Sequence, residues 1–291
     1  MTQKFRDLLD VAIIYLVTAG VGWWVAHSLP GHPMLRAAAA DLAMTALVFA
    51  CSVWKSNSST YDAYWSVIPF LLVVWLFALS DGLGWHSSQW AAMLVVVLWS
   101  WRLTLNWARG WPGWHHEDWR YVDFRAEHGR LFQLTNFFGI HLFPTAIVFI
   151  ACLGLFYVAQ PTAITAWLLW HGAAVGLSGV QLEYVADNQL HAFRQRPGRQ
   201  AADVLDTGIW GVIRYPNYLG EMLFWWGVAL SGLGAGGPWW VLCGAVAMMA
   251  MFLFATIPMK DQRMLQRHPG FAAYYQRVPA LLPLPKSERS A

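Results

Sequence analysis

The chain has 291 residues, of which 57% are hydrophobic and only 12% are charged, and its mean hydropathy is +0.40. Soluble domains carry about 25% charged residues, so this composition excludes an ordinary soluble protein and indicates an integral membrane protein. The formal net charge of +3 is too small to indicate a nucleic-acid partner, and 20 tryptophans are typical of a chain with many residues at membrane–water interfaces.

Apolar stretches of the length needed to cross a bilayer follow one another along the chain. They lie at residues 9–27, 37–54, 65–80, 90–107, 139–159, 163–185, 218–234 and 238–257. The sequence therefore predicts an all-α fold of about eight membrane-spanning helices, with longer polar connections at 108–138 and 186–217 and a tail from residue 258. The opening "MTQKFRDLLD" mixes charges, so we expect a first spanning helix rather than a cleaved signal peptide.

The basic residues indicate how these helices are oriented. If the N-terminus is cytoplasmic, then all 19 Lys and Arg residues except Arg36 and Arg102 fall on the cytoplasmic side. Arg36 falls on the opposite side, and Arg102 lies within a span. Because cytoplasmic connections of membrane proteins are enriched in Lys and Arg, we expect both termini in the cytoplasm.

The first polar group that interrupts the apolar sequence is "NSSTYDAYWSV". Asp62 stands between Tyr61 and Tyr64, just before a short hydrophobic span. A carboxyl group at an apolar boundary can stay protonated and, with a neighbouring tyrosine, donate a hydrogen bond to a substrate carbonyl. The alternative is that Asp62 caps the following helix and that the two tyrosines are interface anchors.

The second group is a polar stripe formed by Arg102, Asn106 and Arg109, which recur at roughly helical spacing. The "HHED" segment that follows lacks a His–x3–His pattern, so we expect no metal site there. Trp111, Trp114 and Trp119 are typical of an amphipathic segment in the interface. The cysteines are far apart in apolar sequence and are expected to be small buried apolar side chains: Cys51, Cys152 and Cys243.

The third group is "QLEYVADNQLHAFRQRPGR", at the end of the sixth predicted span. Glu183 and Asp187 are four residues apart on one helix face, which is mildly unfavourable for like charges unless each has a partner. The carboxylates can accept hydrogen bonds from ribose, and Arg194, Arg196 and Arg199 can hold phosphates. The alternative is a solvated helix end whose charges pair with one another.

The fourth group is "DTGIWGVIRYPNYLGE", at the entry of the seventh span. Gly208 permits a turn, and Pro216 fixes its own φ angle. Arg214, Asn217 and Glu221 are then placed at the membrane edge, where polar side chains are unfavourable unless they have a function. We therefore expect this segment to be a binding site.

Several of these motifs together resemble a bacterial branch of the steroid 5-alpha-reductase family. The similar segments are "RLTLNWARGW", "HEDWRYVDFR", "FFGIHLFP", "EYVADNQLHAFR", "VLDTGIWGVIRYPNYLGEMLFWWG" and "IPMKDQRMLQRHPGFAAYYQRVPALLPL". The resemblance implies a membrane enzyme that reduces the C=C bond of an enone with NADPH. It also implies a seven-helix core plus one extra N-terminal helix, with a two-helix region at 1–54, the reductase-like domain at 55–285 and a tail at 286–291.

The resemblance assigns roles to individual residues. Asn217, Asp187 and Arg194 match positions that bind the cofactor, and Glu221 matches a glutamate of the family. Glu183 stands where the family has an asparagine. The catalytic acid falls near Asp62, with Tyr61 or Tyr64 as hydroxyl donors, because aligning the family arginine with Arg102 places Trp99 where a tyrosine is usual. The complete expected cofactor-binding set is Arg102, Arg109, Asp187, Arg194, Arg214, Asn217, Tyr218, Glu221, Asp261 and Arg263.

Two alternatives stay open. The same C-terminal signature resembles isoprenylcysteine carboxyl methyltransferases, which bind S-adenosylmethionine and act on lipidated substrates. Those proteins carry an acidic pair in the tail, where this chain has Asp261 and Arg263, and this favours a cofactor that bears phosphates. A non-enzymatic, lipid-binding membrane protein is the other alternative. In each case we expect a lipophilic ligand that enters from the lipid, and a location in a bacterial cytoplasmic membrane.

Overall fold

The computed structural model describes residues 2–200 and 202–282, and the regular structure of these residues is helical. The tail expected at 286–291 lies outside the described residues. The helices are α1 Gln3–Ser28, α2 Pro33–Lys55, α3 Tyr64–Leu79, α4 Ser87–Gly110, α5 Trp119–His128, α6 Phe132–Leu134, α7 Phe143–Ala151, α8 Leu153–Ala159, α9 Ala166–Arg194, α10 Pro216–Gly234, α11 Cys243–Met251, α12 Ile257–Arg267 and α13 Phe271–Arg277. Short 3-10 turns include η1 Ser58–Tyr61 and η5 Gly208–Gly211, and π-helical stretches occupy Thr135–Leu142 and Phe252–Thr256.

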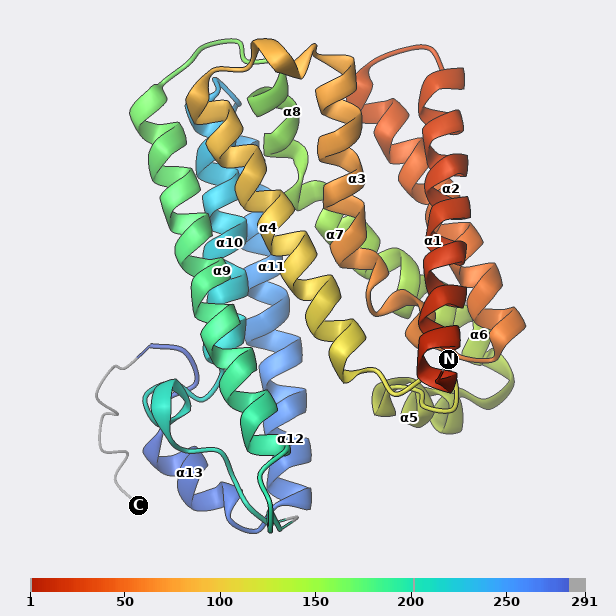
Figure 1. The fold of residues 1–291 in the computed structure, drawn as a ribbon, viewed down its shortest axis with the longest axis vertical. Helices are drawn as coiled ribbons and strands as arrows, with labels where there is room; N and C mark the ends of the chain where they lie inside the picture. The colour runs from red at the N-terminus through yellow and green to blue at the C-terminus, as the bar shows by residue number, and fades with distance from the viewer. Residues whose placement is uncertain (1, 201, 283–291) are drawn as a thin grey trace.

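The long helices form a bundle along the longest axis of the molecule (Figure 1). One end of this bundle, which we call the basic end, carries the N-terminus of α1, helix α5, the 195–215 connection, α12 and α13 (Figure 1). The two longer polar connections predicted from the sequence therefore meet at the same end of the bundle.

The membrane class predicted from composition is confirmed. Within the described residues, six helical stretches are long and apolar enough to cross a membrane: Gln3–Ser28, Pro33–Lys55, Ser58–Leu79, Ser87–Gly110, Trp119–Ala159 and Trp239–Arg267. Large apolar side chains point outward from several of them, including Leu16, Trp54 and Phe254. Such an apolar exterior is what a helix in lipid requires. Helices α9 and α10 fall outside this set of six.

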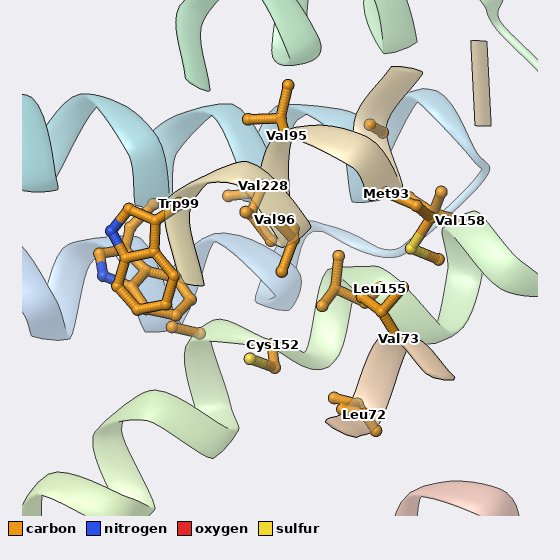
Figure 2. Packing of buried hydrophobic residues seen from close by; sticks show 14 of the residues in the cluster. Leu72, Val73, Met93, Val95, Val96, Trp99, Cys152, Leu155, Val158 and Val228 are labelled. Carbon is orange, nitrogen blue, oxygen red and sulfur yellow. The ribbon is translucent and has the colours of Figure 1, made fainter. Parts of the chain in front are cut away.

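The apolar core lies where α3, α4, α8 and α10 meet. Trp99 of α4 is fully buried, and its ring stacks on Phe224 of α10 with the centroids 4.4 Å apart. Figure 2 shows the packing of this core through Leu72, Val73, Met93, Val95, Val96, Trp99, Cys152, Leu155, Val158 and Val228. The position at which the family resemblance implies a catalytic tyrosine is thus part of the core.

Helices α9 and α10 pack with their backbones close together. A Cβ atom added to Gly227 of α10 would meet the backbone of Gly172 and Gly176 on α9, and one added to Gly220 would meet Glu183. Small residues at such positions let two helices approach closely, as they commonly do in membrane proteins. This close packing places the carboxylate-bearing end of α9 directly against the start of α10.

The N-terminal helices are attached to the same bundle. Lys4 donates to the carbonyl of Arg109 at 2.9 Å, and the Trp114 amide donates to Asp7 at 3.1 Å. Lys55 and Asp10 form an ion pair at 3.0 Å. These contacts fix α1 and α2 against the end of α4 and the loop after it.

The cysteines correct one expectation. All three are free thiols, but only Cys152 is buried, whereas Cys51 is half-buried and Cys243 is exposed. Sequence alone could not show which face of an apolar helix is turned outward, because lipid-facing and core-facing positions are both apolar.

Candidate functional site

A cavity of about 460 Å³ opens at the basic end, between the end of α9, the 195–215 connection, the start of α10, α12 and α13. Its volume falls within the range typical of small-molecule and cofactor sites. Its walls bring together residues from four of the sequence segments singled out above, among them Trp119, Arg194, Asn217 and Arg263.

The charges that line this cavity are strongly unbalanced. Among the described lining residues six are basic and one, Asp203, is acidic. The basic residues are Arg194, Arg199, Arg214, Lys260, Arg263 and Arg267. Concentrated positive charge in a concave site attracts anionic ligands, and arginine and lysine are the usual side chains for phosphate groups.

The 195–215 connection is held in place by contacts with α9 and α13. Gly208 has a φ angle of 60°, in the left-handed region, and the following backbone N–H donates to Gln189 Oε1 at 3.0 Å. The Trp210 indole donates to the carbonyl of Ala186, and the Tyr274 hydroxyl donates to the carbonyl of Trp210 at 2.7 Å. The turn that the sequence predicted at Gly208 therefore forms one wall of the cavity.

Arg214 holds the segment after α13. Its backbone N–H donates to the carbonyl of Pro279 at 2.8 Å, and its guanidinium donates to the carbonyls of Tyr275 and Val278. The same guanidinium pairs with Asp261 at 3.0 Å. Arg214 is only 6% exposed, so it positions the cavity wall and turns little of its charge to the cavity.

Asp261 is also committed to structure. It accepts a hydrogen bond of 2.6 Å from the hydroxyl of Tyr215, in addition to its pair with Arg214. Burial is the largest cause that raises the pKa of Tyr215, and the hydrogen bond to Asp261 raises it further. The tail residue that the sequence placed at a cofactor is thus part of the scaffold that carries the "RYPNY" turn.

Asn217, at the start of α10, has a side-chain oxygen that is unpaired within the described part of the chain. Pro216 occupies the first turn of this helix, where its missing N–H and fixed φ are favourable. The side-chain oxygen of Asn217 is buried and has no hydrogen-bond partner among the described residues, and Asn217 lines the cavity. Tyr218 lies beside it, with its ring stacked on Tyr215 at 5.1 Å. An unpartnered buried amide oxygen is unfavourable unless a ligand donates to it.

The polar stripe of α4 meets α9 just inside the bundle. Arg102 pairs with both Glu183 and Asp187, the second at 2.7 Å, and Asn106 donates to Asp187 at 2.9 Å. One guanidinium between two carboxylates removes the like-charge repulsion expected for Glu183 and Asp187. The two carboxylates of the third predicted group, Glu183 and Asp187, are therefore paired, among the described residues, with Arg102 of α4 and not with a residue of their own helix.

Glu221 is held by two indoles. Trp99 donates to one carboxylate oxygen at 3.0 Å and Trp225 to the other at 2.9 Å, and Glu221 is 5% exposed. Trp99, which stands where the family resemblance implies a tyrosine, therefore contacts Glu221 of α10. Arg109 lies at the exposed end of the stripe, where it donates to Asn188 at 3.5 Å.

The expected catalytic trio is not brought together. Asp62 accepts a hydrogen bond of 2.6 Å from Tyr121 of α5. Tyr61 instead contacts Thr145 at 2.8 Å, and Tyr64 donates to Asp41 at 3.2 Å. Tyr61 and Tyr64 are buried between α2, α3 and α7, away from the partner of Asp62. The tyrosine hydroxyl that donates to the predicted acid is therefore that of Tyr121, and Ser59 also hydrogen-bonds to the same carboxyl group.

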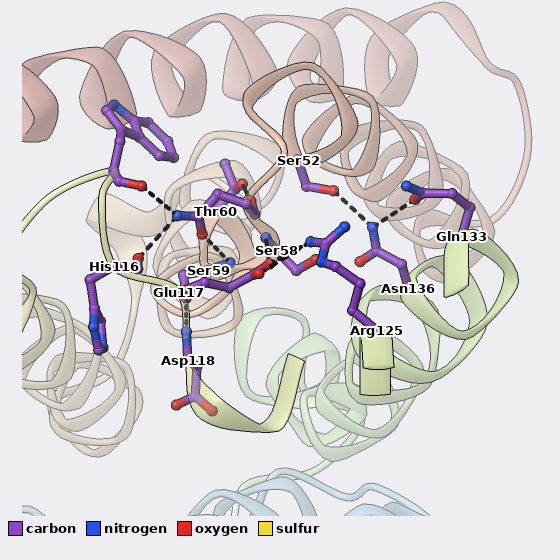
Figure 3. A network of polar contacts seen from close by, with 12 residues as sticks. Ser52, Ser58, Ser59, Thr60, His116, Glu117, Asp118, Arg125, Gln133 and Asn136 are labelled. Carbon is purple, nitrogen blue, oxygen red and sulfur yellow. Dashed lines mark hydrogen bonds and ion pairs between the residues drawn. The ribbon is translucent and has the colours of Figure 1, made fainter. Parts of the chain in front are cut away.

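A network of polar contacts fixes α5 against the start of α3 (Figure 3). The Ser58 amide donates to Glu117 at 2.7 Å, and Arg125 pairs with the same carboxylate at 2.9 Å. The Asp118 amide donates to Ser59 at 2.9 Å. The "HHED" segment therefore places Asp62 and Tyr121 next to each other through its backbone and its two acids.

Asp118 and Arg120 belong to this network and interact electrostatically with two residues that line the cavity. Burial raises the pKa of Asp118, but its hydrogen bonds and ion pair with Arg120 outweigh burial and leave the pKa below its usual value. Asp118 and Arg120 lie within electrostatic range of both Lys260 and Tyr218. Arg263 adds a direct contact, because its guanidinium lies 3.5 Å from the centroid of the Trp119 ring and it pairs with Asp123 at 3.2 Å.

The sequence analysis did not single out three contributors to this region: Tyr121, Lys260 and Arg267. The signal for Tyr121 was present in "HEDWRYVDFR", a segment that was recognised as a motif but whose hydroxyl was not paired with Asp62. Lys260 and Arg267 are two of the many basic residues that the orientation rule places on the cytoplasmic side. Nothing in the sequence distinguished those that line a cavity from those that only follow the orientation rule.

Comparisons with known proteins identify the family of the chain. The family model described as "Protein of unknown function (DUF1295)" matches residues 48–278. The chain is similar to a Schizosaccharomyces pombe protein described as "Uncharacterized protein C594.04c", with 26% identity over 270 residues that cover 81% of this chain and 76% of the relative. No solved structure matches the chain significantly.

Proposed function

The chain belongs to the DUF1295 family, and we propose that it is a membrane-embedded, NADPH-dependent reductase of the C=C bond of a lipophilic enone, a steroid or another lipid. The observation that carries this proposal is the cavity with six basic lining residues and one acidic one, whose wall includes Asn217 with a buried amide oxygen that has no partner among the described residues.

The charge of the cavity favours a nicotinamide dinucleotide over S-adenosylmethionine. NADPH carries a pyrophosphate and a ribose phosphate and is strongly anionic, so the basic walls would attract it. S-Adenosylmethionine carries a positive sulfonium, for which a site lined by six basic side chains is unfavourable. The surroundings of Asp261 also favour NADPH. Its carboxylate is already bound by Arg214 and Tyr215 and so is not free to pair with a cationic cofactor.

The residues that would hold the cofactor are those that remain turned toward the cavity. Arg194, Lys260 and Arg263 would hold phosphates, and Asn217 would accept a hydrogen bond from a ribose or amide group. Arg214 and Asp261 position this set, and Arg102 keeps Asp187 and Glu183 fixed at the inner end.

The chemistry of the protein's own groups is hydrogen bonding to the substrate carbonyl. NADPH, when bound, would supply a hydride to the β-carbon of the double bond, and solvent or a nearby hydroxyl would supply the proton that the α-carbon gains. The Tyr121 hydroxyl donates to Asp62 in one short hydrogen bond. When Asp62 is protonated, the pair holds two O–H protons: one lies in the hydrogen bond between the two groups, and the group that accepts this bond can donate its own O–H to the substrate carbonyl. Such preorganised donation to a developing enolate is worth a few kcal/mol, about 10²–10³ in rate for one donor.

We also propose that α9 and α10 cross the membrane, which gives eight spans with both termini in the cytoplasm of a bacterium. Helix α9 has 29 residues, about 44 Å at 1.5 Å per residue, which is longer than the hydrocarbon core. The described basic residues support this orientation, because those outside the spans gather at the basic end, whereas Arg36 lies near the opposite end of α2.

Isothermal titration calorimetry of the full-length protein in detergent with NADPH, NADH and S-adenosylmethionine tests the proposal. We expect NADPH to bind, Asn217→Ala to abolish binding, and Arg194→Gln to weaken it about tenfold or more, since a charge-assisted hydrogen bond contributes about 1.5–3 kcal/mol. The matched control is Arg277→Gln, because Arg277 lies at the same end but pairs with Asp206 outside the cavity walls.

Two results would count against the reductase. Tight binding of S-adenosylmethionine with no response to NADPH would indicate a methyltransferase. Binding of none of the three would favour a non-enzymatic lipid-binding protein. NADPH affinity that is unchanged in the Asn217 and Arg194 variants would show that the cofactor binds elsewhere.

A further inference from the structure

A second cavity, of about 110 Å³, lies between α1, α2, α3 and α7, and it shares no lining residue with the basic cavity. Its walls are apolar apart from Asp41 of α2 and the indole N–H groups of Trp23 and Trp75. Two residues of its lining, Trp23 and Val74, are 45% and 42% exposed on the outer surface of the bundle, so the cavity reaches the face that lipid covers. The family match begins at residue 48 and therefore does not include the segments of α1 and α2 that line this cavity.

Asp41 is only 3% exposed, and its carboxyl group is half satisfied. Oδ1 accepts the hydroxyl of Tyr64 at 3.2 Å, whereas Oδ2 is buried with no partner among the described residues. A carboxyl oxygen left unpaired inside a membrane protein is costly, and such residues mark ligand or proton sites. The buried indole N–H of Trp75, which belongs to the same lining, is also without a described partner.

We propose that this cavity binds the hydroxyl end of a neutral lipophilic alcohol. A hydroxyl group is the smallest head group that can both donate to Asp41 and accept from an indole N–H. The apolar walls suit a hydrocarbon, and an engineered cavity of about 150 Å³ holds a benzene ring, so this cavity takes the head end while the rest of the ligand lies in lipid.

A cationic head group is less suitable than a hydroxyl. The guanidinium of Arg36 lies 5.4 Å from the centroid of the Trp75 ring, and Arg36 also donates to the carbonyl of Ala26, another lining residue. Arg36 therefore already brings a positive charge beside the cavity, and this charge offsets the attraction of Asp41 for a second cation. The structure for these reasons favours an alcohol over an amine.

Photolabelling of the full-length protein in nanodiscs tests the proposal. The probe is a diazirine-bearing C16 alcohol, and cross-linked peptides containing Trp23 or Trp75 are quantified by mass spectrometry. We expect saturable labelling that hexadecanol displaces at a membrane mole fraction about tenfold lower than hexadecane requires, because the alkane cannot hydrogen-bond to Asp41. This competition uses the unaltered protein and so does not depend on how a variant folds.

Two variants locate the effect at the carboxyl group. Asp41→Leu should remove the preference for hexadecanol, and Asp41→Asn, which keeps a donor and an acceptor, should retain most of it. Equal displacement by hexadecanol and hexadecane, or tighter displacement by hexadecylamine, would overturn the proposal. Unchanged preference in Asp41→Leu would overturn it as well. None of these results bears on NADPH binding, because the basic cavity is built from other residues.

Discussion

The hydroxyl of Tyr121 and the carboxyl of Asp62 lie 2.6 Å apart on two different elements, helix α5 and the turn before α3. Their contact depends on the loop at residues 111–118, whose backbone and acids bind η1. Because the contact is a single hydrogen bond between two side-chain oxygens, a substitution that changes one of these oxygens can remove it while the apolar core stays the same.

Tyr121→Phe deletes only the phenolic oxygen. If the pair donates to the substrate carbonyl, this change should lower kcat by roughly 100-fold while the NADPH dissociation constant stays the same, and Asp62→Asn should do likewise. Steady-state NADPH oxidation with an enone that the wild-type protein reduces gives kcat, and calorimetry gives the affinity. The control is Tyr184→Phe, since Tyr184 is 60% exposed on α9. A Tyr121 variant with normal turnover would exclude this residue from the reaction.

At the scale of residues, the sequence alone locates a polar cluster where one short segment contains all of its members. The start of α10 is an example, because proline, asparagine and glutamate follow one another within two turns and all lie on or beside the cavity wall or the inner network. The partner of Asp62 could not be found in the same way, because Tyr121 is 59 residues away in the chain. Which of several nearby hydroxyls faces a carboxyl group depends on the loop between them.

At the scale of elements, the pairing of α9 with α10 decides where the inner carboxylates lie. The two helices approach through glycines, so that Gly220 packs on Glu183 and the Arg102 pairs form beside the start of α10. The sixth span was predicted at residues 163–185, whereas helix α9 continues to Arg194. Its last turns are charged, and hydropathy alone cannot follow a helix beyond its apolar part.

Gly227→Ala should push α9 and α10 apart. A Cβ at this position meets the backbone of Gly172 and Gly176, which cannot move away as a side chain can, so we expect destabilisation of about 1–3 kcal/mol. Thermal unfolding in detergent, followed by intrinsic fluorescence, should show a lower midpoint. Gly20→Ala is the matched control, because a Cβ on Gly20 meets no atom within 4 Å. Equal midpoints for the two variants would show that the helices are not in close contact.

At the scale of the whole molecule, charge and polar connections are concentrated at one end. Helices α5, α12 and α13 and the 195–215 connection all lie there (Figure 1). The sequence was sufficient to predict this concentration at one end. Hydropathy locates the spans, and the distribution of Lys and Arg shows which connections lie on the same side. It was not sufficient to predict a second cavity at Asp41, since a single acid in "AAAADLAMTALVFA" does not reveal which neighbouring helix faces it.

Cysteine labelling of intact bacterial cells tests the proposed orientation. In a background without the native cysteines, Pro30→Cys should react with a membrane-impermeant maleimide, because the short α1–α2 connection lies at the end opposite to the basic end. Glu127→Cys, on an exposed position of α5, should react only after the cells are permeabilised. The reverse pattern would place the basic cavity outside the cytoplasm.

The hydrogen bonds from Arg214 and Tyr215 to the segment at 275–280 have a consequence for biosynthesis. The carbonyls that Arg214 and the Tyr215 amide bind are made about sixty residues after the turn itself, behind α11, α12 and α13. A nascent chain therefore inserts α10 before the wall of its cavity exists. The wall of this cavity closes only when residues up to Ala280 have been made and have left the ribosome, so a chain interrupted earlier would reach the membrane with its helices but without this wall.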